Sequence, residues 1–305
     1  MEIIQYLISP IIALILAPLL FGVINKTKAF FAGRKGYPIL QLYYDLFKFF
    51  KKDSVISEIT TNIFKISPVI VFGTILAAIT VLPFISTFPG KGFTGDFVLI
   101  FYLLALGRFF LVLSALDTAS SFEGMGASRE VLFSALAEPI IFILILSILR
   151  VNHTTSLITA FAGMTDRNWV VVMLAAIPMF IVMLTENSRI PFDDPNTHLE
   201  LTMIHEVMIL DNSGVELGLF EYASSLKLWL FSLIFVKIIS PFNGAGIVME
   251  VSTTLLLMFL TAVLVGIVES LIARSSLLKV PQLLYSAGII ACLGFFISIT
   301  NLLQR

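Results

Sequence analysis

Acidic side chains gather in one stretch of the sequence, from Glu186 to Glu221. It holds eight of the chain's 20 acidic residues but only one basic residue, Arg189. Apolar runs long enough to cross a membrane lie on both sides of it. Ionisable groups at such a place are costly and usually have a function. The stretch therefore supplies the first candidates for ion or proton chemistry: Glu186, Arg189, Asp193, Glu200, Glu206 and Asp211.

Two histidines lie among these acids. The prolines and aspartates of 191–195 predict a helix over 196–210, with an aspartate as its cap. On that helix His198 and His205 would be separated by about 10.5 Å, too far to share one metal ion at about 2.0–2.1 Å per bond. The spacing argues against a metal site. The histidines are either proton relays, because their reference pKa is near 6.5, or ordinary interfacial residues.

A second group of candidates lies upstream, in and after the segment 117–130. Small residues in this segment allow close backbone approach, and it carries Glu123 and Glu130. Eight residues further on, Glu138 stands in an otherwise apolar run. A carboxyl inside a membrane span usually marks an ion or proton path. The alternative is that Glu138 only pairs with a nearby arginine, such as Arg108.

Three further charged residues, Lys237, Glu250 and Glu269, stand near the predicted ends of apolar runs. Long side chains can lie along apolar surface and keep the charged group in water. We therefore expect these three charges to reach the membrane interface.

The composition predicts the elements that hold these residues. The chain is 58% hydrophobic and 13% charged, with a mean hydropathy of +1.01, whereas soluble domains carry about 25% charged residues. This indicates an all-α fold, a polytopic transmembrane helical bundle in a single integral membrane domain over 1–305. The apolar runs predict about eight spans: Ile3–Ile24, Ile66–Phe84, Phe97–Leu116, Val131–Leu149, Val170–Thr185, Leu226–Ile239, Ile247–Ile272 and Leu283–Leu303.

The distribution of lysine and arginine predicts the orientation. Alternation of the spans puts loops 25–65, 117–130, 186–225 and 273–282 on one side of the membrane. These loops carry 12 Lys and Arg residues, and the opposite loops carry three. The positive-inside rule then makes the first set cytoplasmic and both termini external. We expect a multi-pass protein of the cell membrane, with the acidic stretch on its cytoplasmic side.

The first of these loops contains a Gly- and Pro-bearing turn over 33–38 and then Leu42, Leu46 and Phe49 at helical spacing. One interpretation is an amphipathic helix on the membrane, with its basic residues toward anionic lipid. The other is a docking surface for a soluble partner. The candidates for docking are Arg34, Lys35, Gln41, Asp45 and Lys48.

Several classes of function find no support in the sequence. There is no Walker A loop, nucleophile elbow or Rossmann glycine fingerprint, and a net charge of -1 suggests no nucleic-acid partner. The single cysteine, Cys292, cannot hold an iron–sulfur cluster or zinc, so we expect any such centre on another chain. Two functions remain: the coupling subunit of a redox-driven ion pump, or a self-contained secondary transporter. The lack of a visible internal repeat disfavours the transporter.

Several motifs together resemble a known family. Glu186-x-x-Arg189-x-Pro-Phe-Asp193, followed by Glu200-Leu and Asp211-x-Ser-Gly, resembles the signature loop of the respiratory complex I subunit 1 family. The first loop, with Gly-x-Pro over 36–38, is similar to that family's first cytoplasmic loop. Arg-Phe-Phe over 108–110, Leu-Asp-Thr over 116–118, Gly-Ala-Ser-Arg-Glu over 126–130 and Glu-Pro over 138–139 are more similar to its membrane-bound hydrogenase branch, which includes formate hydrogenlyase subunit 4 and hydrogenase-4 component C.

The signature loop also departs from the family pattern. Three acids at alternate positions in the family align here with Asn196, His198 and Glu200, so only the last is kept. Asp211 and Asn212 stand where the family usually has Glu and Tyr. The quinone chemistry and the proton route of the family therefore do not transfer directly to this chain.

The resemblance implies a membrane anchor that binds no cofactor itself. Its partners would be hydrogenase-like large and small subunits, an iron–sulfur subunit and antiporter-like membrane subunits. A nickel–iron centre and iron–sulfur clusters would lie on those partners, and a quinone is possible. A quinone-site subunit of a NADH:quinone oxidoreductase-like complex is the alternative. The ion-coupling candidates are Glu138, Glu186, Arg189, Asp193, Glu200 and Asp211; secondary candidates are Arg108, Glu123, Glu130, His198, His205 and Glu206.

Overall fold

The computed structural model describes residues 2–82, 84–85, 92–162, 169–193, 203–240, 246–276 and 279–303. All regular secondary structure in these ranges is helical, which confirms the predicted all-α fold. The helices are α1 (Glu2–Phe31), α2 (Gln41–Phe49), α3 (Asn62–Val81), α4 (Asp96–Asp117), α5 (Ser121–Val151), α6 (Leu157–Ala162), α7 (Trp169–Glu186), α8 (His205–Met208), α9 (Gly214–Ile239), α10 (Ile247–Leu271) and α11 (Lys279–Leu303).

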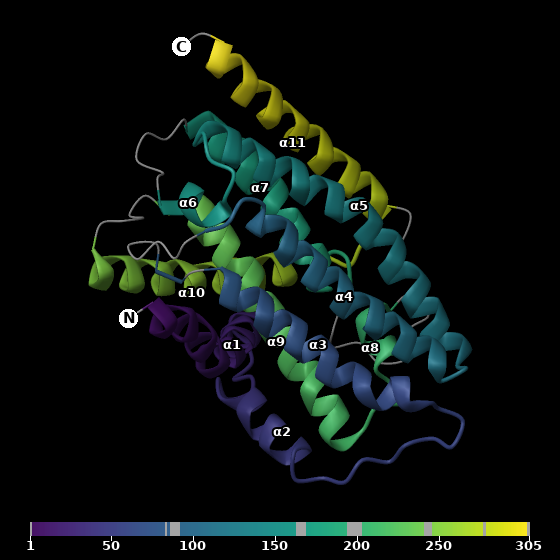
Figure 1. The fold of residues 1–305 in the computed structure, drawn as a ribbon. Helices are drawn as coiled ribbons and strands as arrows, with labels where there is room; N and C mark the ends of the chain where they lie inside the picture. The colour runs from purple at the N-terminus through teal and green to yellow at the C-terminus, as the bar shows by residue number, and fades with distance from the viewer. Residues whose placement is uncertain are drawn as a thin grey trace.

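Eight of these helices correspond to the eight predicted spans. Seven are long and apolar enough to cross a membrane, and Val170–Glu186 in α7 is a shorter apolar helix. The chain is a multi-pass membrane protein. Helix α9 is the central one, because 78% of its apolar window is buried, against 50% or less in the other six. Figure 1 shows most helices running from upper left to lower right, with α10 lying across them.

The helices extend further than hydropathy predicted. The predicted loop 117–130 is largely the first part of α5, and the predicted loop 186–225 includes the first three turns of α9. These segments carry acids that hydropathy counts as loop residues. Glu123 and Glu130 are buried in α5, where neighbouring polar groups offset part of the cost of burial. Polar residues with partners can therefore continue a helix beyond its apolar part.

The helix predicted over 196–210 is wrong in its described part, since Met203 and Ile204 are not helical. Only α8 is helical there. The Asp193 carboxylate accepts hydrogen bonds from the backbone N–H groups of Ile204 (2.9 Å) and His205 (3.2 Å). Asp193 therefore satisfies backbone N–H groups at the start of α8, 12 residues further along the chain, and is not the adjacent N-cap that was predicted.

Helix α2 confirms the predicted amphipathic helix. Leu46 is buried, and Leu42 and Phe49 are partly buried, whereas Lys48 is exposed. The Gln41 amide donates to the Asp45 carboxylate at 3.0 Å one turn later. In Figure 1 both ends of the chain lie on the left of the bundle, α2 lies at the bottom, and α8 lies at the lower right.

Candidate functional site

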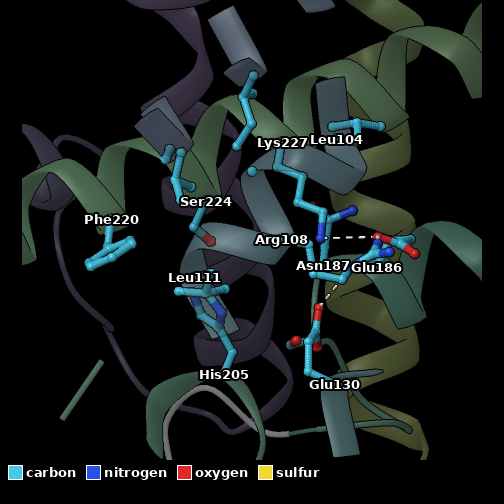
Figure 2. Close-up of a pocket in the computed structure, with 15 residues that line it drawn as sticks. Leu104, Arg108, Leu111, Glu130, Glu186, Asn187, His205, Phe220, Ser224 and Lys227 are labelled. Carbon is cyan, nitrogen blue, oxygen red and sulfur yellow. Dashed lines mark hydrogen bonds and ion pairs between the residues drawn. The ribbon is translucent and has the colours of Figure 1, made fainter. Parts of the chain in front are cut away.

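The candidate site is a small cavity between α3, α4, α5, α7, α8 and α9 (Figure 2). It offers about 40 Å³ that water can occupy, enough for roughly three molecules at about 10–15 Å³ each. Its charged walls are Arg108, Glu130, Glu186 and Lys227, and His205 lines it from α8. The cavity can therefore hold water between titratable side chains.

Arg108 on α4 is the centre of this site. Its guanidinium donates to the carboxylates of Glu138 on α5 and Glu186 on α7, the latter at 2.5 Å. Its Nε lies 3.6 Å from Oε1 of Glu130. One cation thus joins three helices through three acids, and the predicted contact between Arg108 and Glu138 is confirmed.

Lys227 on α9 adds a second cation. Its Nζ lies 3.0 Å from Oε2 of Glu186, whose side chain is 2% exposed. We call Arg108, Glu130, Glu138, Glu186 and Lys227 the Arg108 cluster. Fully ionised, it has three negative and two positive charges, so one added proton neutralises it. Because opposite charges at short range offset the cost of burial only in part, such a cluster is suited to take up and release a proton.

Sequence reasoning missed Lys227. It lies one residue inside the predicted span Leu226–Ile239, and a lysine at that place is unusual in a membrane helix. That position in the sequence was the feature by which Lys227 could have been recognised as a candidate. Its partner could not be foreseen, because it lies on a different helix, about 40 residues away in the sequence.

A row of acids on α5 leads from the end of the bundle to this cluster. Glu123 and Glu130 are seven residues apart and so lie on one face of the helix. Glu123 is fully buried, bonds the Thr118 hydroxyl and accepts the backbone N–H of Asp211 at 3.1 Å. The predicted candidate Asp211 is therefore joined to the row through its backbone.

Arg189 pairs with an acid outside the set of candidate site residues. Its Nη1 lies 3.4 Å from Oε1 of Glu269 on α10. Its guanidinium also stacks over the Phe21 ring of α1, 4.1 Å from the centroid, and Lys28 contacts Glu269 at 2.9 Å. Arg189 therefore contacts α1 and α10, which are distant in the sequence, and a local sequence pattern could not predict these contacts.

The prediction that Lys237, Glu250 and Glu269 reach the interface is wrong. The Nζ of Lys237 lies 2.7 Å from Oε1 of Glu250, with the two side chains 0% and 1% exposed. The Glu269 side chain is also fully buried. Each charge has an opposite charge on another helix within reach, so burial with a partner replaces solvation.

Beside the cavity, α8 holds two titratable groups outside the spanning helices. Burial raises the pKa of Glu206 to about 8, helped by the negative charges of Glu221 and Asp193 and opposed by Arg189. Burial also lowers the pKa of His205 to about 4, as do the nearby Lys227 and Arg189. At neutral pH Glu206 is therefore mainly protonated and His205 is neutral.

Asp193 is buried and pairs with Arg274 at 3.1 Å. The candidates His198 and Glu200 lie outside the described residues. Among the described residues, no group of three or more His, Cys, Asp or Glu side chains is placed to bind a metal ion. Of the docking candidates, Arg34, Lys35 and Lys48 are exposed.

The sequence of the chain matches a known protein family. Residues 3–300 match the NADH dehydrogenase family, and the chain belongs to it, within the subunit 1 group. It is 31% identical to hydrogenase-4 component C of Escherichia coli (strain K12), over 97% of this chain and 96% of that protein. It is 26% identical to formate hydrogenlyase subunit 4 of the same strain, over 97% and 98%. The predicted family and branch are confirmed.

Two further matches were found. A NADH-quinone oxidoreductase subunit of Sulfurimonas denitrificans is 27% identical over 76% of this chain and 80% of its own length. A chain in the structure of the membrane-bound sulfane sulfur reductase, an archaeal respiratory membrane complex, superposes with a TM-score of 0.83 at 21% identity. The superposition covers 97% of this chain and 99% of that one, so the two share a fold.

Proposed function

We propose that this chain is the membrane anchor and coupling subunit of a complex I-like, membrane-bound hydrogenase-type complex. It links electron transfer in docked subunits to translocation of protons or sodium ions. Two relatives that align over nearly the whole chain are named as components of hydrogenase-4 and formate hydrogenlyase, which supports a multisubunit complex in the membrane. The nickel–iron centre and the iron–sulfur clusters lie on partner chains, and antiporter-like subunits continue the ion path.

The Arg108 cluster is the observation that carries the coupling role. On α5, Glu123, Glu130 and Glu138 stand at successive intervals of about 10 and 12 Å along the axis. Glu138 lies seven residues, or about 10 Å, inside the predicted span Val131–Leu149 of α5, within a bilayer core of about 30 Å. Acids spaced in this way, with water-sized space beside them, provide successive protonation sites from the start of α5 into the membrane.

The coupling step is electrostatic. A change of charge on a redox centre docked beside α8 would alter the relative stability of protonated and ionised carboxyl groups nearby. Glu206 responds first, because its pKa of about 8 lies close to neutrality. The buried ion pairs of Glu186 with Arg108 and Lys227 extend this effect into the membrane. When one member of the pairs gains or loses a charge, the electrostatic potential at the other members changes.

A quinone-site subunit is the second candidate function. The match to a NADH-quinone oxidoreductase subunit favours it. The two candidates differ in the electron acceptor: hydrogen evolution by the purified complex supports the first, and reduction of an added quinone supports the second. A self-contained secondary transporter is disfavoured, because the relatives are named as components of multisubunit complexes. Such a transporter would purify without redox chains.

The orientation of the chain belongs to the same proposal. The exposed basic residues Lys35 and Lys48 lie in the turn between α1 and α2 and in α2 itself. We assign this region to the cytoplasm, where soluble redox subunits dock, and both termini to the outside of the cell membrane.

The double charge reversal Lys35→Glu, Lys48→Glu tests the docking role. Charged groups across an interface act mainly on association, so the soluble subunits should be lost from washed membranes of this variant. Lys279→Glu, an exposed charge on the same side at the start of α11, is the matched control. If the soluble subunits stay bound and active in the double variant, the docking face lies elsewhere.

A further inference from the structure

An open groove of about 430 Å³ lies at the end of α1, apart from the Arg108 cluster. It is formed by the last turns of α1, the turn that follows and the end of α10. Its lining residues are Asn25, Lys28, Ala29, Phe31, Ala32, Arg34, Gly36, Tyr37 and Ser270. The groove therefore combines basic, hydroxyl-bearing and apolar side chains at the point where a membrane helix ends.

The turn after α1 builds the groove. Gly33 ends the helix in the left-handed region (φ 65°), and the N–H of Arg34 donates to the carbonyl of Ala29 at 2.8 Å, as in a Schellman motif. At Gly36 a Cβ would lie 2.3 Å from that of Ala29, so only glycine allows the turn to fold onto the helix. This fold holds Arg34 over the groove.

The groove has an excess of positive charge. Arg34 is exposed and has no ion pair with any described residue, and Lys26 and Lys35 flank the groove. Lys28 is paired with the buried Glu269 at 2.9 Å, and Glu269 also contacts Arg189. An anion that enters the groove therefore meets Arg34 first, and it shares Lys28 with Glu269.

An exposed apolar surface continues from the groove along α10. Leu256, Leu260 and Leu264 recur at intervals of four residues and are 41–61% exposed, and Leu271 beside Ser270 is 71% exposed. This spacing puts the three leucines on one face of the helix. The site thus pairs a basic pocket at the end of a membrane helix with an apolar face suited to an acyl chain.

We infer that this groove binds the headgroup of an anionic glycerophospholipid, with its phosphate on Arg34 and Lys28 and an acyl chain along α10. Basic pockets at helix ends on the cytoplasmic side suit such headgroups, and basic residues near the surface attract anionic lipid. Free phosphate would use only the basic half of the site. The acyl-chain face favours the lipid, and this inference does not depend on the proposed coupling role.

Lipid retention by the intact complex tests the inference. The complex is purified in detergent, exchanged into mixed micelles with equal phosphatidylglycerol and phosphatidylcholine, and analysed by native mass spectrometry. Wild type should retain phosphatidylglycerol preferentially. Arg34→Gln should weaken retention about fivefold, the change that corresponds to ~1 kcal/mol per basic residue near an anionic surface. Lys65→Gln, an exposed basic residue on α3 outside the groove, is the matched control.

Three outcomes would overturn the inference. Equal retention of the two lipids by wild type shows that the groove does not select an anion. Equal loss in Arg34→Gln and Lys65→Gln shows a general charge effect. Displacement of the retained phosphatidylglycerol by millimolar inorganic phosphate assigns the groove to free phosphate. If Arg34→Gln alters folding, lipid retention is measured instead in Leu260→Gln, a variant on the acyl-chain face. This variant should lower lipid retention while the basic pocket stays intact.

Discussion

Replacing Glu206 by glutamine should remove a pH-dependent part of the stability. Its pKa is raised to about 8 by burial and by the neighbouring acids Glu221 and Asp193, whereas an unfolded glutamate has a pKa of about 4.3. Between these two values the folded state holds a proton that the unfolded state lacks. The resulting stabilisation is complete at low pH and is lost as the pH rises through about 8.

The size of the loss follows from the two pKa values. From pH 7 to pH 9 the Glu206 carboxyl goes from mostly protonated to mostly ionised, and its contribution to the free energy of unfolding falls by about 1.4 kcal/mol. Glutamine keeps the shape and the neutral state of the protonated acid. The melting midpoint of wild type should therefore fall between pH 7 and 9 by a few degrees more than that of Glu206→Gln.

Thermal unfolding followed by circular dichroism, in the same detergent at pH 7 and 9, measures this difference. Glu58→Gln is the control, because Glu58 is exposed. If wild type and Glu206→Gln lose the same number of degrees over this pH range, the Glu206 carboxyl does not titrate between pH 7 and 9, and our account of the α8 environment is wrong.

Two further predictions concern topology and the second ion pair. A cysteine at Lys51 should resist an impermeant thiol reagent in intact cells, and one at Arg150 should react; the reverse pattern would refute the assigned orientation. Glu250→Gln should destabilise the bundle by about 3–5 kcal/mol, because it leaves Lys237 charged and buried. Adding Lys237→Met should recover most of that loss in denaturant unfolding, and no recovery would show that the pair does not act as a unit.

The fold could largely be predicted from the sequence because hydropathy alone marks membrane spans. All eight spans correspond to helices, and α2 is amphipathic as its spacing predicted. The helix ends could not be predicted, because Glu123 and Glu130 are tolerated inside α5 only through partners on other elements. A pattern read along one helix carries no information about such partners.

The sequence predicted which residues belong to the candidate site better than it predicted which of them are in contact. Arg108, Glu138 and Glu186 are brought together by the structure, whereas Arg189 turns to Glu269. Lys227 was missed because its role depends on the packing of α9 against α7. Charge pairs between helices are set by tertiary packing, and a single sequence shows only that each charge needs some partner.

The most direct test of the central claim is the number of ions moved per electron passed. Glu138→Gln keeps the size of the side chain and leaves Arg108 paired with Glu186 and Glu130, so the complex should assemble. Both rates are measured in the same proteoliposomes containing the whole complex, with Glu58→Gln as the control. We predict that electron transfer continues in Glu138→Gln while the ratio of ions to electrons falls, and that the control keeps the wild-type ratio. An unchanged ratio in Glu138→Gln would contradict the coupling role of the Arg108 cluster.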